Sequence, residues 1–170
     1  MMFETIGDHI TSKIRERSRV QGHTLTGKFE AGLGYEIRRD GDNFTIVGLD
    51  ESGVGKYLDK FLPASKVPYS PGSGASKSLF IDGLKRYAEQ RFGLSGKEAM
   101  SAAFAMATKM KKEGKPTYGS MQYSGNGSRT GVITDTLEEE SDTIGEMIRM
   151  EAGRQAVIEF TNLIRKYKWQ

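Results

Sequence analysis

The stretch Tyr35-Glu-Ile-Arg-Arg-Asp-Gly-Asp-Asn-Phe-Thr-Ile-Val47 decides the fold class of this chain. Tyr35 and Ile37 alternate with charged neighbours, which is the pattern of a strand with one buried face. The turn cluster Asp40-Gly-Asp-Asn43 then leads into a second apolar run that begins at Phe44. The pattern predicts a two-stranded antiparallel hairpin. Such a hairpin is marginal alone and must pack on helices or pair with further strands.

Helical spacing of apolar residues surrounds the hairpin on both sides. Ile6, Ile10 and Ile14 recur every four residues before it, and charged residues occupy the opposite face. Two further helical stripes follow, one that stops near Gly93 and one that a capping box at Ser95 begins. A last apolar period predicts a long C-terminal helix over residues 136–168. We therefore expect one α+β domain over residues 1–170, a small antiparallel sheet packed on several helices.

Length and composition limit the class of protein. At 170 residues the chain can build one well-packed core, and its net charge of +3 permits contact with nucleic acid without arguing for it. The absence of Cys excludes disulfides and thiolate chemistry. No signal-peptide pattern opens the chain, and no run of about twenty apolar residues could span a membrane. We expect synthesis in a bacterial cytoplasm and no membrane contact.

Signatures of catalysis are incomplete throughout the sequence. The run Gly53-Val-Gly-Lys56 resembles the end of a phosphate-binding loop, but Asp50 and Tyr57 replace its first Gly and its magnesium-binding hydroxyl. The two histidines are too few for a histidine-rich metal site, and His9 is expected on the solvent face of the first helix. The sequence therefore predicts no catalytic, cofactor-binding or metal-binding residue, and no enzyme.

Two loop-rich segments are the candidate functional elements. Residues 51–77 are rich in Pro and Gly and are expected to project or dock, whereas residues 113–131 are expected to form a projecting arm or hairpin that leads into a short strand at residues 132–134. A connection of about twenty residues is uncommon in a compact domain unless it has a function. The candidate docking residues are Tyr57, Phe61, Leu62 and Tyr69, and the candidate assembly-arm residues are Lys115, Tyr118, Met121, Tyr123 and Arg129.

The second of these segments has more than one reading. It is either an arm that orders against a partner or a disordered tether. The basic residues from Lys109 to Arg129 are interleaved with Tyr118 and Tyr123, a composition that could also follow phosphates and stack bases. A small cytoplasmic nucleic-acid-binding protein is therefore the alternative to an assembly protein.

Three stretches together resemble the tail-completion or neck proteins of tailed bacteriophages. The entry into the hairpin looks like that family's Thr-Gly-Xaa-Leu-Xaa-Xaa-Ser-Ile, with Phe29 in the Leu position and Gly32 in place of Ser. The other two look like virion proteins of phages that infect Bacteroidetes. The stretches are Thr26-Gly-Lys-Phe-Glu-Ala-Gly-Leu-Gly-Tyr-Glu-Ile37, Phe80-Ile-Asp-Gly-Leu-Lys-Arg-Tyr-Ala-Glu-Gln-Arg-Phe-Gly-Leu-Ser95, and Ala103-Phe-Ala-Met-Ala107 followed by Lys112-Glu-Gly-Lys-Pro-Thr-Tyr-Gly-Ser120 and Arg129-Thr-Gly131.

The resemblance implies a structural virion protein without a cofactor. Such proteins form homo-oligomeric rings of six or twelve copies in the neck or upper tail, where they join the portal or head to the tail around the DNA channel. The expected partners are therefore further copies of the chain and the neighbouring portal, adaptor and tail proteins, with genomic DNA close by. A head-to-tail ring needs two different complementary patches on each subunit, which suits a chain with long connecting segments.

Overall fold

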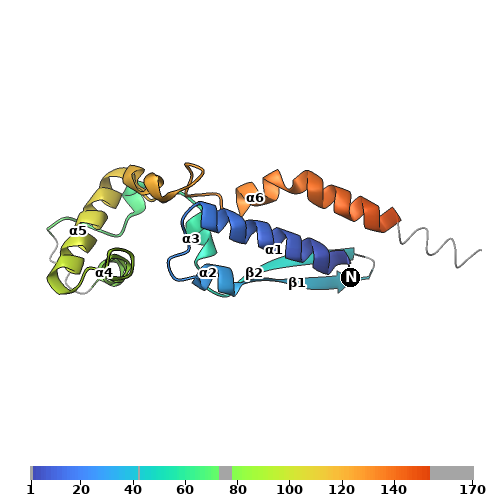
Figure 1. The fold of residues 1–170 in the computed structure, drawn as a ribbon, viewed down its shortest axis with the longest axis horizontal. Helices are drawn as coiled ribbons and strands as arrows, with labels where there is room; N and C mark the ends of the chain where they lie inside the picture. The colour runs from blue at the N-terminus through green and yellow to red at the C-terminus, as the bar shows by residue number, and fades with distance from the viewer. Residues whose placement is uncertain (1, 42, 73–77, 154–170) are drawn as a thin grey trace, which may run out of the picture.

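The computed structural model describes residues 2–41, 43–72 and 78–153, and it confirms an α+β fold (Figure 1). The described part of the chain is built from helices and one hairpin. The elements are α1 (Met2–Val20), α2 (Lys28–Gly32), β1 (Leu33–Asp40), β2 (Asn43–Asp50), α3 (Gly55–Asp59), the 3-10 helix η1 (Ala64–Lys66), α4 (Leu79–Phe92), α5 (Gly96–Glu113), the 3-10 helix η2 (Tyr118–Tyr123) and α6 (Thr134–Glu139).

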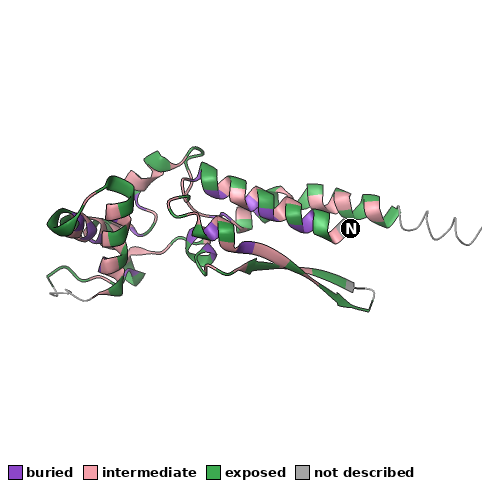
Figure 2. Cartoon of the chain, turned by 60° about the horizontal axis from the view of Figure 1, so that its bottom comes forward, coloured by how far each residue is buried: buried purple, intermediate pink, exposed green. Residues whose placement is uncertain are grey.

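The hairpin forms as its alternation predicts, and α1 covers one of its faces. β1 and β2 pair antiparallel with Ile37 opposite Ile46, and they make the only sheet among the described residues. The Phe3 ring of α1 stacks on Phe44 with ring centroids 4.2 Å apart. The Tyr35 hydroxyl lies 3.0 Å from both the Glu4 carbonyl oxygen and Asp8 Oδ1. The far face of the hairpin is open to solvent (Figure 2).

Two separate clusters of buried apolar side chains hold the chain together. The first lies where α1 meets the start of β1 and α3, and consists of Ile14, Phe29, Leu33, Leu58 and Val132. The second lies between α4 and α5 and consists of Ile81, Ala103 and Ala107, with Tyr69 and Phe104 packed against it. Alanines at the contact let the two helices approach closely. The two clusters occupy different parts of an elongated molecule (Figure 1).

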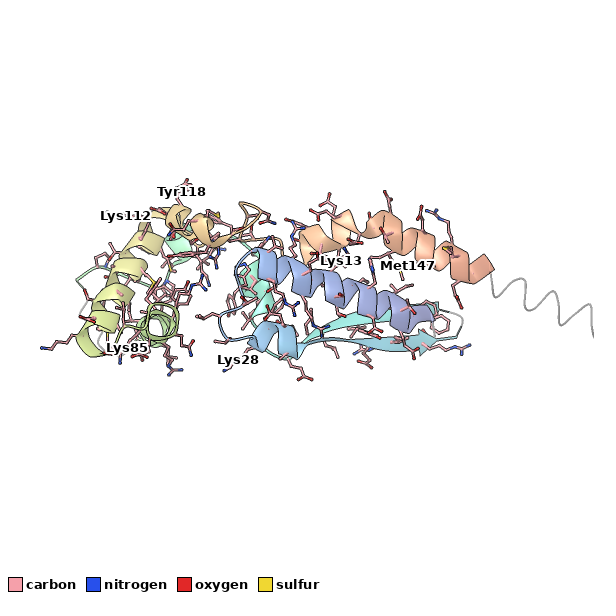
Figure 3. All side chains as sticks on the ribbon, in the orientation of Figure 1. Lys13, Lys28, Lys85, Lys112, Tyr118 and Met147 are labelled. Atoms are coloured by element: carbon pink, nitrogen blue, oxygen red, sulfur yellow. The ribbon has the colours of Figure 1, made fainter. Side chains whose placement is uncertain are left out.

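The C-terminal helix is observed only in part. Residues 141–153 continue the direction of α6 after a break at Glu140, and residues 154–168 of the expected helix lie outside the described part of the chain. The pair runs along α1, with the labelled Lys13 and Met147 in the region where the two helices meet (Figure 3). His9 donates a hydrogen bond to Glu140 Oε2 at 2.7 Å. The expectation of a solvent-facing His9 was therefore wrong, because the helix from α6 onward covers that side of α1.

Two local expectations for the connecting segments were also wrong. Residues 113–131 form no hairpin, since Tyr118–Tyr123 is a 3-10 helix, and residues 132–134 enter α6 rather than a strand. Residues 51–72 contain the helix α3 as well as loop, while residues 73–77 are outside the described part. Backbone hydrogen bonds join the two segments to each other, as described below, and in residues 113–131 they take the place of the pairing expected for a hairpin.

Candidate functional site

Residues 115–131 form a loop whose two ends are fastened to the same short stretch of chain. At one end, Lys115 exchanges two backbone hydrogen bonds with Leu62, at 2.8 and 2.9 Å. At the other, the Gly131 N–H donates to the Asp59 carbonyl oxygen at 2.9 Å. A loop with closed ends and its own internal contacts belongs to a class that often carries function. We call residues 115–131 the clamped loop.

The body of the clamped loop lies against the C-terminal end of α1. The Gly125 N–H donates to the Val20 carbonyl oxygen at 2.7 Å, and Gln21 Nε2 donates to the Thr130 carbonyl oxygen at 2.9 Å. Gly22 has φ +72°, and a Cβ there would lie 2.3 Å from the Tyr123 carbonyl oxygen. Only glycine allows so close an approach, so the end of α1 and the clamped loop fit together through this residue.

Arg129 is the side chain that fixes the loop to the helix end. Its Nη1 donates to the Ser120 carbonyl oxygen at 3.1 Å, and its Nη2 to the Gly22 carbonyl oxygen at 3.4 Å. Nη2 also lies 3.4 Å from Nδ1 of His23. A cation suits this position because the last carbonyl groups of a helix carry partial negative charge.

Further positive charge gathers around Arg129. The Arg91 guanidinium, from the last turn of α4, lies over the Tyr123 ring with its carbon 5.0 Å from the ring centroid. Lys115 stands at the start of the clamped loop. We call this group the basic seam: His23, Arg91, Lys115, Tyr123 and Arg129.

The charges of the basic seam act on one another. Burial lowers the pKa of Arg129, and repulsion from Arg91 lowers it further. The pKa of Lys115 is lowered first by its crowded surroundings, although the residue as a whole is exposed, and second by Arg129. Burial, and then Arg129, lower the pKa of His23 to about 4. His23 is therefore neutral at pH 7, and the positive charge of the basic seam comes from Arg91, Lys115 and Arg129.

The basic seam has no carboxylate of its own. Among the described residues, no Asp or Glu pairs with Arg91, Lys115 or Arg129. Two acids lie nearby. Glu30 accepts from Ser18 Oγ at 3.0 Å through one oxygen and acts on His23 through its charge, and Glu113 accepts from the Tyr118 N–H at 2.9 Å. The seam therefore offers positive charge and hydrogen-bond donors, which suit an anion rather than a proton-transfer reaction.

The structure brings together three of the five candidate assembly-arm residues. Lys115, Tyr123 and Arg129 lie in the basic seam, where Arg129 is half-buried. Tyr118 is 82% exposed and stands at the outer side of the molecule near Lys112 (Figure 3), while Met121 is half-buried in η2. The arm is thus partly docked on its own subunit and presents one aromatic ring to solvent.

The candidate docking residues divide into two pairs. Tyr57 and Phe61 are 61% and 55% exposed. Leu62 is half-buried at its backbone pairing with Lys115, and Tyr69 packs on α5, where its hydroxyl accepts from Thr108 Oγ1 at 3.3 Å. Docking by Leu62 and Tyr69 therefore occurs within the chain itself.

Reasoning from the sequence missed two members of the basic seam. His23 follows the Gly that ends α1, and Arg91 lies in the last turn of α4. The only sequence signal for them is their position beside helix ends, where basic residues are common for local reasons. Their convergence depends on how the clamped loop sits between the two helices, which no local pattern encodes.

Neither a metal-binding cluster nor a membrane-spanning helix occurs within the described ranges. Residues 2–41, 43–72 and 78–153 contain no group of three or more His, Asp or Glu that could hold a metal ion. None of the helices in those ranges is both long and apolar enough to cross a membrane. No protein-family model, curated protein or solved structure matches the chain.

Proposed function

We propose that the chain is a non-enzymatic structural subunit that assembles head to tail with copies of itself into a ring of six or twelve. By its resemblance to tail-completion and neck proteins, the ring would belong to the neck or upper tail of a tailed phage. It would join the portal or head to the tail around the DNA channel, and its location would be the virion. The distribution of charge along the elongated molecule is the observation that carries this proposal.

Acidic and basic residues are separated between the two ends of the molecule. The helical residues 134–153 carry seven acidic residues against one arginine, whereas residues 78–131, which contain α4 and α5, carry nine basic residues against four acidic ones. Figure 1 places these segments at different ends of the molecule. A subunit with opposite charge at its two ends can join copies of itself head to tail, which is the heterologous contact of a closed ring.

Part of the acidic charge is unpaired within the described part of the subunit. Asp135, Glu139 and Glu140 bind α1 through Arg17, His9 and Lys13. Three further acidic residues of this helical region are exposed and form no ion pair among the described residues: Glu138, Asp142 and Glu146. These three carboxylates are available to a neighbouring copy.

Large apolar side chains are exposed beside both charged regions. Leu79 and Phe92 of α4 are 90% and 45% exposed. Ile148 and Met150, on the acidic helix, are 46% and 63% exposed. Apolar groups rimmed by charge are typical of surfaces that bind other proteins, so both ends carry the composition of an interface.

The mass of the protein in solution tests the proposal. Light scattering coupled to gel filtration should give six or twelve times 18.8 kDa, and negative-stain images should show rings. Glu146→Lys should shift the mass towards the monomer because it reverses charge on the acidic helix. The control Glu51→Lys makes the same change at an exposed residue outside both charged regions and should assemble normally. A wild-type protein that remains a monomer at every concentration would contradict head-to-tail self-assembly.

A further inference from the structure

We propose that the basic seam is a binding site for a phosphate group, with Arg91 and Lys115 as the direct donors and Arg129 as a fixed positive charge behind them. This proposal does not depend on the ring, because every residue of the seam belongs to one subunit. It rests on three observations: the convergence of cations, the state of their donors and the aromatic rings beside them.

The first observation is that three cations from two parts of the chain converge, and none of them is ion-paired among the described residues. Arg91 comes from α4, and Lys115 and Arg129 come from the two ends of the clamped loop. Each is close enough to repel the next, Arg91 acting on Arg129 and Arg129 on Lys115. Like charges held together are unfavourable, and a bound phosphate anion would reduce that repulsion.

The second observation concerns which donors are free. Both Nη atoms of Arg129 already donate to backbone carbonyl oxygens, so Arg129 contributes charge rather than contacts. Arg91 and Lys115 form no side-chain hydrogen bond within the described residues, and both are exposed. An exposed guanidinium and an exposed ammonium are common ligands of a phosphate.

The third observation is the pair of tyrosines in the same loop. Tyr123 carries the Arg91 guanidinium on its ring, and Tyr118 is 82% exposed in the same 3-10 helix. Exposed aromatic rings next to phosphate-binding cations suit a single-stranded nucleic acid, whose bases stack on them. The phosphate could equally be a free ion, since both sources present the same oxygens. The experiment below separates the two.

Two titrations test the site. In the first, inorganic phosphate is added to the full-length protein and the protonation of His23 is followed by NMR. A bound anion next to Arg129 should raise the pKa of His23 from about 4, because it offsets the nearest repulsive charge. Besides Arg129, the charged groups that act on His23 are Lys115, which lowers its pKa, and Glu30, which raises it. Lys115 is itself a donor in the proposed site, so a bound phosphate offsets its charge as well and shifts the His23 pKa in the same direction. In the second titration, fluorescence anisotropy follows a labelled oligothymidylate over a range of salt concentrations.

Matched variants show whether the basic seam is responsible. Arg91→Gln and Lys115→Gln should each weaken binding about tenfold and reduce the dependence on salt by about one ion. Arg86→Gln makes the same change at another exposed arginine of α4 and should leave affinity within about twofold of wild type. Thermal melting shows whether each variant is folded; Arg91 and Lys115 are exposed, so the substitutions should preserve the fold.

Each outcome supports or overturns the proposal. Binding of the oligonucleotide alone, lost in Arg91→Gln, supports a phosphodiester. Binding of inorganic phosphate with equal affinity and a shifted His23 pKa supports a free ion. Equal weakening by Arg86→Gln and Arg91→Gln overturns the site in favour of general surface charge. Absence of binding by both ligands overturns it as well, whatever mass the protein has in solution, so this result is separate from the test of ring assembly.

Discussion

Asp59 joins two parts of the chain through one residue. Its Oδ1 accepts hydrogen bonds from the backbone N–H groups of Ile133 and Thr134, at 2.7 and 2.8 Å, and its carbonyl oxygen accepts from Gly131. The first N–H groups of a helix lack partners within that helix. Asp59, at the end of α3, therefore caps α6 from a distance and closes the clamped loop.

Replacement of the Asp59 side chain should remove the cap on α6, whereas the backbone hydrogen bond from Gly131 that closes the clamped loop keeps its acceptor. Asp59→Ala leaves two N–H groups at the start of α6 without an acceptor, and we expect a loss of about 1–2 kcal/mol in the free energy of unfolding. Asp59→Asn keeps one acceptor oxygen and should lose less. Urea unfolding followed by circular dichroism measures both variants. An unchanged midpoint in Asp59→Ala would show that the cap contributes nothing to stability.

His23 should make stability depend on pH. Its pKa is about 4 in the folded protein, below the ordinary value of 6.5, so between these values the unfolded chain binds the proton more readily. The stabilising effect of a neutral His23 is complete above pH 6.5 and is lost as the pH falls towards 4. We expect a lower urea midpoint at pH 5 than at pH 7, with a smaller difference in His23→Gln.

The carboxylates contribute in a different pH range. Hydrogen bonding from His9 lowers the pKa of Glu140 below its usual value of 4.5, so the stability it adds is lost only as the pH falls below that value. The comparison at pH 7 and pH 5 therefore reports mainly on His23. Equal pH dependence in wild type and His23→Gln would contradict the assignment.

At the scale of elements, the packing of α4 on α5 depends on small side chains. Ala103 and Ala107 are fully buried and lie against Ile81. Larger residues at these positions would hold the two helices apart, because a packed contact has no room for three additional carbon atoms. The buried positions of α5 must therefore be small as well as apolar.

A pair of identical substitutions separates packing from helix propensity. Ala103→Leu should lower the free energy of unfolding by about 1–3 kcal/mol because it overfills the contact with α4. Ala105→Leu places the same side chain on the exposed face of α5 and should change it by no more than about 0.5 kcal/mol. Chemical unfolding of the two variants side by side measures the difference; equal losses would rule out overpacking.

The regular elements could be predicted from the sequence because their patterns are local. The spacing of Ile6, Ile10 and Ile14 gave α1, and the alternation of Tyr35 and Ile37 gave the hairpin. Both depend on residues at most four positions apart. The shape of residues 113–131 could not be predicted this way, since its Gly, Ser and Asn content fits a hairpin, a tether or a clamped loop. The decisive bonds, from Leu62 and Asp59, involve another part of the chain.

The same distinction applies to the candidate site. Lys115, Tyr123 and Arg129 were identifiable because they share one unusual segment. His23 and Arg91 reach the basic seam from the ends of α1 and α4, and nothing in their own neighbourhoods marks them. When a site is assembled from separate elements, any one stretch of sequence contains only some of its residues.

At the scale of the whole molecule, the clamped loop contacts both α1 and α4, the helices that contribute to the two buried clusters. It bonds to the end of α1 through Val20 and Gly22, and through Tyr123 it meets Arg91 of α4. The two clusters are otherwise joined by the stretch around Leu62 and η1, which packs on α5. The stability of the loop therefore bears on how firmly the two ends of the molecule are held.

Loss of Arg129 should loosen this connection. Arg129→Gln removes a charged group that donates to two carbonyl oxygens, and we expect the Gly125 N–H, which donates to Val20, to exchange with solvent about tenfold faster. Hydrogen exchange followed by NMR or mass spectrometry measures this change. Lys112→Gln, at an exposed lysine of α5, is the control. Unchanged exchange at Gly125 would show that Arg129 does not hold the loop.

The pairing of α1 with the helix from α6 onward also has a consequence during synthesis. His9 and Arg17 bind Glu140, Asp135 and Glu139, residues that leave the ribosome more than a hundred positions later. At about 5–20 residues per second, α1 waits on the order of ten seconds for these partners. Throughout that interval one side of α1 is uncovered on the growing chain. Nascent chains that stop before Thr134 should therefore be the species that chaperones retain and that aggregate most readily.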